Sequence, residues 1–397
     1  MNRYNFSRNK IADTLITLPI IFAFTGIFLY ENSAKNILAV ISISCIISLC
    51  VHGCSHIKNQ IKENKIIWAL CAMVLYGIYQ NQTHGYSNGL IKTYFFIGMY
   101  FSIVPKAILT KQRTHLLTYS LLASLCSLFF YYQQEVTLGN NRGSWDIGVL
   151  HYTVLSAWLM CFGFYKLACK GSIITKTKSL IIIFANGLII TTMQVRGSAI
   201  ALIIIALLFL TYLICKKNIQ LQIIVSLMLL VTYFAVYQSS DVQQRLTQTQ
   251  NEITSILNGN LNTSIGYRLQ MWKSAYYIIP ESPLFGVGNQ HKEIKKSLAN
   301  QGIISMTAAN FSHYHNEYIN TLVKSGAVGL LLLLSLLFYP LSVFRKKVHH
   351  DNLPLLFLFL IYGITALTNV PFSNLQLNIF FLTISWIYSS NLEQEKI

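Results

Sequence analysis

Two histidines, His313 and His315, stand one residue apart where a long polar stretch of the chain gives way to an apolar run. A neutral imidazole can take a proton from a hydroxyl group near neutral pH, which makes His315 a candidate general base. Two other interpretations stay open. His313 and His315 could bind a metal ion together with His291, although the sequence lacks a His-Glu-x-x-His or Asp-x-Asp pattern. His315 and Asn316 could also cap the helix that follows.

Two arginines are candidates for binding an anionic group. Arg196 lies in the middle of the apolar run from Ser179 to Cys215, where a guanidinium is costly without an anionic partner or a polar cavity. It could clamp a phosphate group bidentately, or its side chain could extend to lipid headgroups. Arg268 begins a helical stripe that contains Trp272, and an exposed helix charge is the favoured interpretation from its position alone.

Gly326 and Gly329 follow the histidines within the next apolar run. Small residues let membrane helices approach closely, so both glycines are predicted to serve close packing between helices. The carboxylates on the same side of the predicted membrane do not pair in the sequence. An acid–base pair of the kind that glycosidases use is therefore not indicated.

The composition requires a membrane around the elements that position these residues. Hydrophobic residues make up 53% of the 397 residues and charged residues only 11%, whereas a soluble domain carries roughly 25% charged residues. Apolar runs of about 18 or more residues recur along the chain. The sequence therefore predicts an all-α, polytopic integral membrane protein with about twelve transmembrane helices. The predicted spans are 11–30, 35–54, 66–80, 89–105, 116–133, 149–168, 179–194, 198–215, 219–237, 319–344, 353–371 and 374–390.

Lysine and arginine predict the orientation of these spans. The net charge is +17, but the Lys and Arg residues form short clusters between apolar runs, which set topology and disfavour a nucleic-acid partner. With both termini in the cytoplasm, every cytoplasmic connection is basic and the short outer loops are nearly bare. The run from Ser179 to Cys215 has basic residues beside both ends, so it is predicted to be two short helices with Arg196 and Gly197 at the outer tip.

One long polar segment, 238–318, falls on the outside between spans nine and ten and is predicted to be partly helical. Apolar stripes over 242–256 and 265–279 have helical spacing, and the prolines and glycines from Pro280 to Gly288 then end the helix. The chain is predicted to form one functional unit of three parts. These parts are a membrane domain at 1–237, the outer loop at 238–318 and a membrane domain at 319–397.

The eight cysteines lie in apolar runs or at their basic ends, which argues against a disulfide framework. Cys50 and Cys54 share a helix face without a second pair at metal spacing, so they are interpreted as packing residues. The N-terminus is basic and leads into an apolar run from Ile11 to Tyr30. The length of this run favours a retained first span over a cleaved signal peptide.

The spacing after His315 resembles a periplasmic motif of the bacterial O-antigen ligases, which belong to the O-antigen ligase/polymerase superfamily. His315 and Asn316 are followed after nine residues by Gly326 and after two more by Gly329. This order matches the pattern His-[Asn/Ser/Gln]-x9-Gly-x2-[Gly/Thr/Tyr] of that family.

Further segments carry the same resemblance. Arg196 between two short spans, Arg268 early in the large loop, and the Pro283–Gly288 segment are similar to features of these proteins. The resemblance covers the architecture of the whole chain. It implies a GT-C-like fold with a large periplasmic loop between spans nine and ten.

The resemblance also implies an activity. An O-antigen ligase transfers polysaccharide from undecaprenyl diphosphate to the lipid A–core oligosaccharide at the periplasmic face of the bacterial inner membrane, without a cofactor or a metal ion. The implied partners are these two lipid-linked substrates and membrane lipids. The implied roles are proton acceptor for His315, binding of the donor diphosphate for Arg196 and Arg268, and support for Asn316, His313, Gly326 and Gly329.

Other functions stay open from the sequence. An O-antigen polymerase and a protein O-oligosaccharyltransferase share the carrier and the topology and differ in the acceptor. A transporter or flippase for lipid-linked sugars would put polar residues near mid-membrane, whereas here they gather on the outer face and in one loop. A membrane scaffold without catalysis would be insensitive to the loss of Arg196 or His315.

Overall fold

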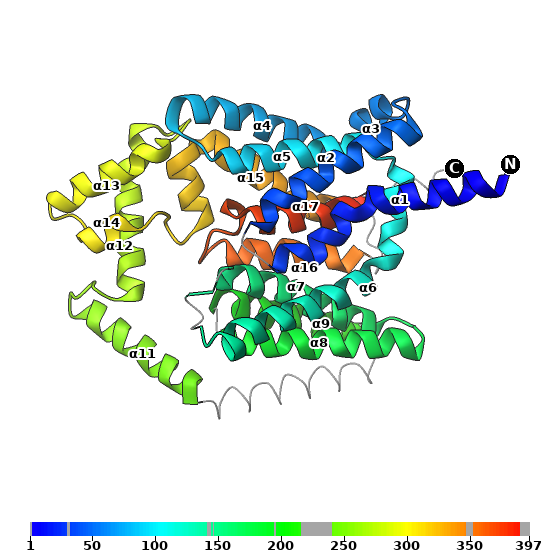
Figure 1. The fold of residues 1–397 in the computed structure, drawn as a ribbon. Coiled ribbons are helices and arrows are strands. Elements are labelled where there is room, and N and C mark those ends of the chain that lie inside the picture. Colours follow the sequence, from blue (N-terminus) through cyan, green and yellow to red (C-terminus); the bar gives the residue numbers. More distant parts are fainter. Residues whose placement is uncertain are drawn as a thin grey trace. The chain divides into compact units, whose positions relative to one another are not determined.

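The computed structural model describes residues 2–29, 32–140, 144–145, 147–193, 196–215, 240–346 and 352–389. Over these ranges the chain is helical, with connecting turns and without a β-strand (Figure 1). The predicted class, an all-α polytopic membrane protein, is confirmed. The chain divides into two compact units. One comprises Met1–Ala201, Leu331–Ala366 and Pro371–Ile397, and the other comprises Leu202–Leu330 and Leu367–Val370.

The first unit is a bundle of helices that, apart from the short helix at Ile57–Glu63, correspond to predicted spans. Its helices are α1 (Asn2–Phe24), α2 (Ser33–His52), α3 (Ile57–Glu63), α4 (Lys65–His84), α5 (Asn88–Ile103), α6 (Lys106–Tyr131), α7 (Val149–Ala168), α8 (Ile173–Met193), α16 (Leu353–Thr365) and α17 (Leu375–Ser389). Two further helices, α9 (Arg196–Cys215) and α15 (Glu317–Lys346), each contribute to both units. Every predicted span falls on a helix except 219–237, which lies outside the described residues.

Two of the helices end several residues earlier than predicted. Helix α1 ends at Phe24 rather than at residue 30, because a 3-10 turn at Gly26–Phe28 interrupts the apolar run. Helix α16 ends at Thr365 rather than at residue 371, where Pro371 opens another 3-10 turn. Hydropathy alone does not show either interruption, because the residues after each helix end are themselves largely apolar.

The helix lengths and surfaces suit a membrane. Among the described residues, four helices are long and apolar enough to cross one, and shorter apolar helices accompany them. Large apolar side chains on the outside of the bundle include Ile43 and Ile46 of α2, 58% and 62% exposed, and Phe184 of α8, 72% exposed. Water is a poor solvent for such a surface, and lipid is a good one. The four long helices cover Ser33–His52, Lys106–Thr137, Ile173–Met193 and Glu317–Arg345.

Helix α17 lies at the centre of the first unit. Every residue from Gln376 to Ser389 is buried, and the helix packs against α1, α5 and α6. A helix that is apolar all round belongs in the interior of a bundle. The neighbouring α7 packs on α8 and α16, where Trp158 donates a hydrogen bond from Nε1 to the carbonyl oxygen of Pro354 at 3.1 Å.

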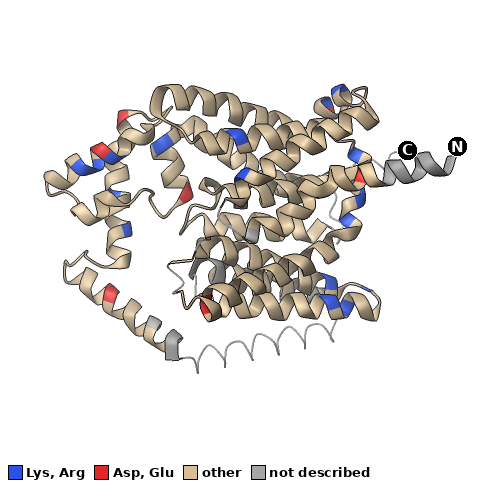
Figure 2. Ribbon diagram, viewed as in Figure 1, with Lys and Arg blue, Asp and Glu red and all other residues tan. Residues whose placement is uncertain are grey.

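Basic residues of three helices of the first unit, α3, α6 and α8, lie towards one end of its bundle. In Figure 2 the lysines and arginines of α3, of the start of α6 and of the start of α8 lie at the same end, on the right of the view. This one-sided placement is the pattern that the positive-inside rule describes. That this end faces the cytoplasm stays a prediction.

The second unit contains the predicted outer loop. Helices α11 (Ser240–Leu257) and α12 (Ser264–Ile278) confirm the two stripes predicted at 242–256 and 265–279. The hydroxyl of Thr263 caps α12 by accepting a hydrogen bond from the backbone N–H of Gly266 at 3.0 Å. Two short helices, α13 (His291–Asn300) and α14 (Met306–Asn310), follow the break after α12.

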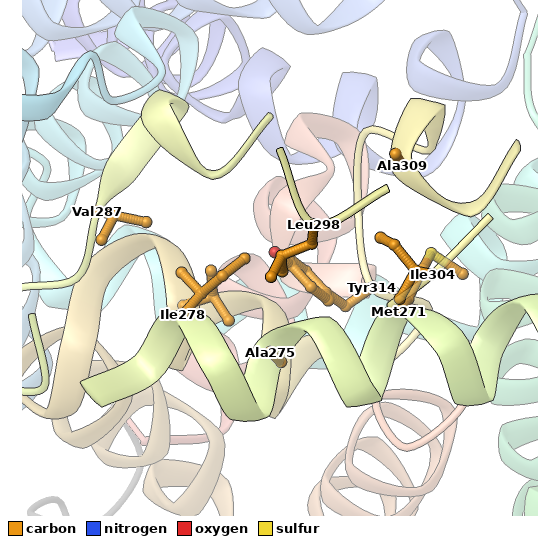
Figure 3. Packing of buried hydrophobic residues seen from close by; sticks show 9 residues of the cluster. Met271, Ala275, Ile278, Val287, Leu298, Ile304, Ala309 and Tyr314 are labelled. Carbon is orange, nitrogen blue, oxygen red and sulfur yellow. The ribbon is translucent and has the colours of Figure 1, made fainter. Parts of the chain in front are cut away.

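Helices α12, α13 and α14 surround a small apolar core, which Figure 3 shows from close by. One face of α12 contributes Met271, Ala275 and Ile278. The ring of Tyr314, the residue between His313 and His315 in the sequence, is also part of this core. The buried residues of this cluster are Met271, Ala275, Ile278, Val287, Leu298, Ile304, Ala309, Tyr314 and Val323.

Removing a side chain from this core should loosen the segment that carries the histidines. Ile278 is fully buried, so Ile278→Ala is expected to cost about 2–5 kcal/mol through lost burial and a cavity. Hydrogen exchange of the α12 amides in purified protein measures this cost. The control is Tyr276→Ala on the same helix, where the side chain is 77% exposed. Equal exchange in both variants would contradict the assignment of the core.

Candidate functional site

Tyr314 fixes the segment 311–316, which connects α14 to α15. Its side chain is fully buried, and its ring centroid lies 5.7 Å from that of His291. Its carbonyl oxygen accepts a hydrogen bond from Nε1 of Trp272 on α12 at 2.9 Å. The half-buried rings of His313 and His315 lie 4.3 Å apart. Burial of the tyrosine therefore anchors a segment that brings the two flanking imidazoles together.

The backbone of His315 is strained. Its φ is 48°, and it is the one residue other than glycine with a positive φ among those the structure describes. Such a conformation costs about 1–3 kcal/mol and persists only where neighbouring contacts hold it. Asn316 provides one such contact, because its Oδ1 accepts from the backbone N–H of Ile319 at 3.1 Å and its Nδ2 donates to the carbonyl oxygen of Leu367 at 3.2 Å. The predicted capping role of Asn316 is confirmed.

Both candidate histidines lie in a cationic environment. Burial and then the charges of His315, Lys324, Lys295 and Arg268 lower the pKa of His313 to about 4. Burial and then the charge of Arg268 also lower the pKa of His315, against a side-chain hydrogen bond with Asn369 that raises it. An imidazole with a lowered pKa is neutral at neutral pH and can accept a proton.

The predicted site residues are only partly brought together in the described structure. Arg268 of α12 is half-buried and close enough to both imidazoles for its charge to lower their pKa values. Arg196 is the first residue of α9, and its side chain lies outside the described residues. The run 179–215 contains two helices, as predicted: α8 ends at Met193 and α9 begins at Arg196, so Arg196 and Gly197 belong to the first turn of α9, and residues 194–195 lie outside the described residues.

The hypothesis of a three-histidine metal site gains no support from the geometry. His291 is fully buried next to Tyr314, and its two ring nitrogens have no hydrogen-bond partner. Burial, followed by the charges of Lys324, Lys295 and Lys292, lowers the pKa of His291 to about 3. Within the described ranges, groups of three or more His, Cys, Asp or Glu side chains that could hold a metal ion are absent.

The turn that runs from Pro283 to Gly288 inserts its backbone into a break in α15. The helix is interrupted at Gly326, where φ is 60°. Residues on both sides of the break bond to the turn instead of to their own helix. These bonds run from Ala327 N to Pro283 O at 2.9 Å, from Val328 N to Leu284 O at 3.2 Å and from Val287 N to Val323 O at 2.9 Å.

Glycine is required on both sides of this contact. A Cβ at Gly326 would lie 2.3 Å from the carbonyl oxygen of Leu284, and one at Gly286 would lie 2.5 Å from the backbone of Lys324 and Ser325. The predicted reason for Gly326, packing between helices, is therefore wrong, because its close neighbour is a turn. Gly329 is buried in α15 three residues further on.

Three polar residues of this site were missed by sequence reasoning. Lys324 lies within an apolar span, and a cation in such a place is a recognisable functional signal. Lys295 belongs to the charge run at 292–296, which is typical of a solvated helix face. Asn369 follows α16 in a short connection and carries no signal of its own.

The helical bundle of one unit and the basic site of the other are typical of one class of protein: an all-α, polytopic membrane protein with neutral histidines next to cationic side chains. A family model described as O-antigen ligase matches residues 180–334. This stretch includes Arg196, Arg268, His315 and the Gly326 break. The match therefore covers all the residues predicted for the site.

Two relatives agree with this match. An O-antigen ligase of Escherichia coli is 23% identical over 364 residues, which cover 87% of this chain and 85% of that protein. An uncharacterized protein of Haemophilus influenzae is 29% identical over 170 residues, and the match spans 40% of this chain and 41% of that protein. Together, the family match and the Escherichia coli relative support membership of the O-antigen ligase superfamily.

The Gly326 break should not tolerate a side chain. Gly326→Ala combines a positive φ with a clash against backbone, so its cost should exceed the roughly 1–2 kcal/mol of an alanine in the left-handed region alone. Gly302→Ala is the matched control, because Gly302 has a φ of 73° and nothing within 4 Å of an added Cβ. Thermal unfolding of the purified variants compares the two. A loss that is no larger for Gly326→Ala would contradict the inserted turn.

The electrostatics of the site predict the titration of its histidines. In NMR spectra of histidine-labelled protein, His313 should titrate near pH 4 and His315 below 6.5. His313 therefore stays neutral as the pH falls through the range where an unperturbed histidine becomes charged, and His315 becomes charged at a lower pH than an unperturbed histidine does. Arg268→Gln should raise both pKa values, whereas Lys273→Gln, an exposed position on the same helix, should leave them unchanged. If the pKa of His315 is the same in Arg268→Gln as in the wild-type protein, Arg268 does not lie close to this imidazole.

Proposed function

We propose that this protein is an O-antigen ligase, which transfers polysaccharide from undecaprenyl diphosphate to the lipid A–core oligosaccharide at the periplasmic face of the inner membrane. The observation that carries the proposal is the pair of neutral imidazoles next to Arg268, within the region that matches the O-antigen ligase family. A base and a cation are the two groups that such a transfer requires.

In the proposed reaction, a hydroxyl oxygen of the acceptor sugar attacks the anomeric carbon of the donor. The bond from that carbon to the diphosphate oxygen breaks, and the electron pair leaves with the diphosphate. His315 takes the hydroxyl proton, for which its lowered pKa leaves it unprotonated and available. Arg268 stabilises the negative charge that develops on the leaving diphosphate.

Arg196 is proposed as the second ligand of the diphosphate. It lies within the family match and would add a second bidentate guanidinium for phosphate oxygens. In this scheme the two arginines neutralise the diphosphate, a task that a divalent ion performs in many other enzymes, so the proposal involves no metal and no cofactor. Both lipid-linked substrates would reach the site from the bilayer.

The proposed placement follows from the distribution of charge along the chain. The termini are proposed to be cytoplasmic, because the basic connections then all face inward. The segment 238–318 is then a periplasmic loop, between membrane domains at 1–237 and 319–397. Cysteine labelling at position 313 from the periplasmic side, but not from the cytoplasm, is the expected result.

An O-antigen polymerase and a protein O-oligosaccharyltransferase are the nearest alternatives, since they would use the same base and the same diphosphate. Purified protein in liposomes with one undecaprenyl diphosphate-linked donor separates them when three acceptors are offered. These are lipid A–core, a second carrier-linked glycan and pilin. Transfer to lipid A–core supports the proposal. Transfer to the carrier-linked glycan would instead indicate a polymerase, and transfer to pilin a protein O-oligosaccharyltransferase. A flippase would transfer to none of them and would move the donor across the bilayer instead.

Loss of the base or of the cation should abolish transfer while the protein stays folded. His315→Ala is expected to lower the rate about 10²–10⁴-fold and Arg268→Ala about 10²–10³-fold. In cells, polysaccharide on lipid A–core should disappear while carrier-linked polysaccharide accumulates. Lys273→Ala, an exposed cation on the same helix as Arg268, is the matched control and should remain active. Normal capped lipopolysaccharide in the His315→Ala and Arg268→Ala strains would defeat the proposal.

A further inference from the structure

Two lysines from different helices bind successive carbonyl groups of the histidine segment. Lys295 of α13 is fully buried, and its Nζ donates a hydrogen bond to the carbonyl oxygen of Phe311. Lys324 of α15 donates from Nζ to the carbonyl oxygen of Ser312 at 3.0 Å. These two peptide groups directly precede His313. The segment is therefore held by ammonium groups just before its first histidine.

Placing two ammonium groups here is costly. Burial, followed by the charges of Lys324 and Lys292, lowers the pKa of Lys295 to about 8, well below that of an ordinary lysine. The exposed Lys292 on α13 adds a third cation, and the buried Glu317 on α15 is the carboxylate whose charge acts on Lys324. Lysines are rarely buried without a compensating role. A neutral side chain would hold a carbonyl group at much lower cost.

We propose that Lys295 and Lys324 form a clamp that positions His313 and His315 for transfer, by fixing the Phe311 and Ser312 carbonyl groups. This proposal rests on the function proposed above. The two lysines are positioning residues, because they act through the backbone of the segment and not on the reacting atoms.

The contacts around the clamp show how it reaches His315. The Nζ of Lys295 also lies 5.3 Å from the centre of the Tyr314 ring, and the Phe311 ring centroid lies 5.6 Å from that of His315. Trp272 holds the carbonyl of Tyr314 on the far side of His313. The lysines thus fix the chain before His313 and Trp272 fixes it after, and the strained φ of His315 needs such support.

The positive charge of the clamp has a second effect. Both lysines contribute to the low pKa of His313, so the clamp helps to keep an imidazole beside His315 uncharged. A charged His313 would repel a proton that moves to His315, since the two rings lie 4.3 Å apart. The same two side chains therefore fix the segment and keep the His313 imidazole unprotonated.

The test uses full-length protein in liposomes with the lipid diphosphate donor and lipid A–core. Lys295→Met and Lys324→Met should lower kcat about tenfold or more, because small misplacements of reacting groups are costly. KM for both substrates should stay within about threefold, since neither lysine binds them directly. Lys324→Arg should restore much of kcat, and Lys324→Gln, which keeps a donor without the charge, should fall between. The matched control is Lys296→Met, at an exposed position of α13.

A second readout does not depend on activity. Hydrogen exchange at the amides of residues 313–316 should accelerate in the two methionine variants and not in Lys296→Met, and the pKa of His313 should rise. Wild-type kcat together with unchanged exchange in both variants would overturn the clamp. A wild-type protein without transfer would instead overturn the proposed function, and the exchange data would then still decide whether the lysines hold the segment. If Lys295→Met fails to fold, Lys295→Arg and the Lys324 variants carry the test.

Discussion

The site depends on one constraint: His315 has a left-handed backbone that the chain would abandon without support. The support comes from both directions along the sequence. Before it, Tyr314 is buried in the core formed by α12, α13 and α14 and is bonded by Trp272. After it, Asn316 caps α15 and bonds to residue 367. Strain of this kind is found where a side chain has to be aimed, and here the side chain is an imidazole.

The second feature of the site is an excess of positive charge. Arg268, Lys295 and Lys324 lower the pKa of His313, and Arg268 also lowers that of His315. The nearby buried carboxylate is Glu317. Nearby cations disfavour protonation of an imidazole and favour the binding of an anion. One arrangement therefore prepares both halves of the proposed reaction, since the base stays free and the leaving diphosphate meets a positive field.

Much of the fold could be predicted because hydropathy and helical stripes are local signals. The spans and the stripes of α11 and α12 follow from them, and the two helices within the run 179–215 follow from its length and from the basic residues beside both ends. Helices α13 and α14 were missed, since they are short and owe their stability to the core around Tyr314. The role of Gly326 was wrong, because the turn that inserts beside it lies about forty residues earlier in the chain. Lys295 and Lys324 gain their meaning only through contacts with residues 311 and 312, which no spacing pattern encodes.

In the proposed reaction, a diphosphate and an acceptor hydroxyl meet at the segment 311–316. The most direct measurement is an experimental structure of the protein with an undecaprenyl diphosphate-linked sugar bound. We expect diphosphate oxygens about 2.7–2.9 Å from the guanidinium of Arg268, with the anomeric carbon on the side of His315. A diphosphate bound elsewhere on the protein, with Arg268 and His315 touching neither the phosphates nor the sugar, would refute this arrangement.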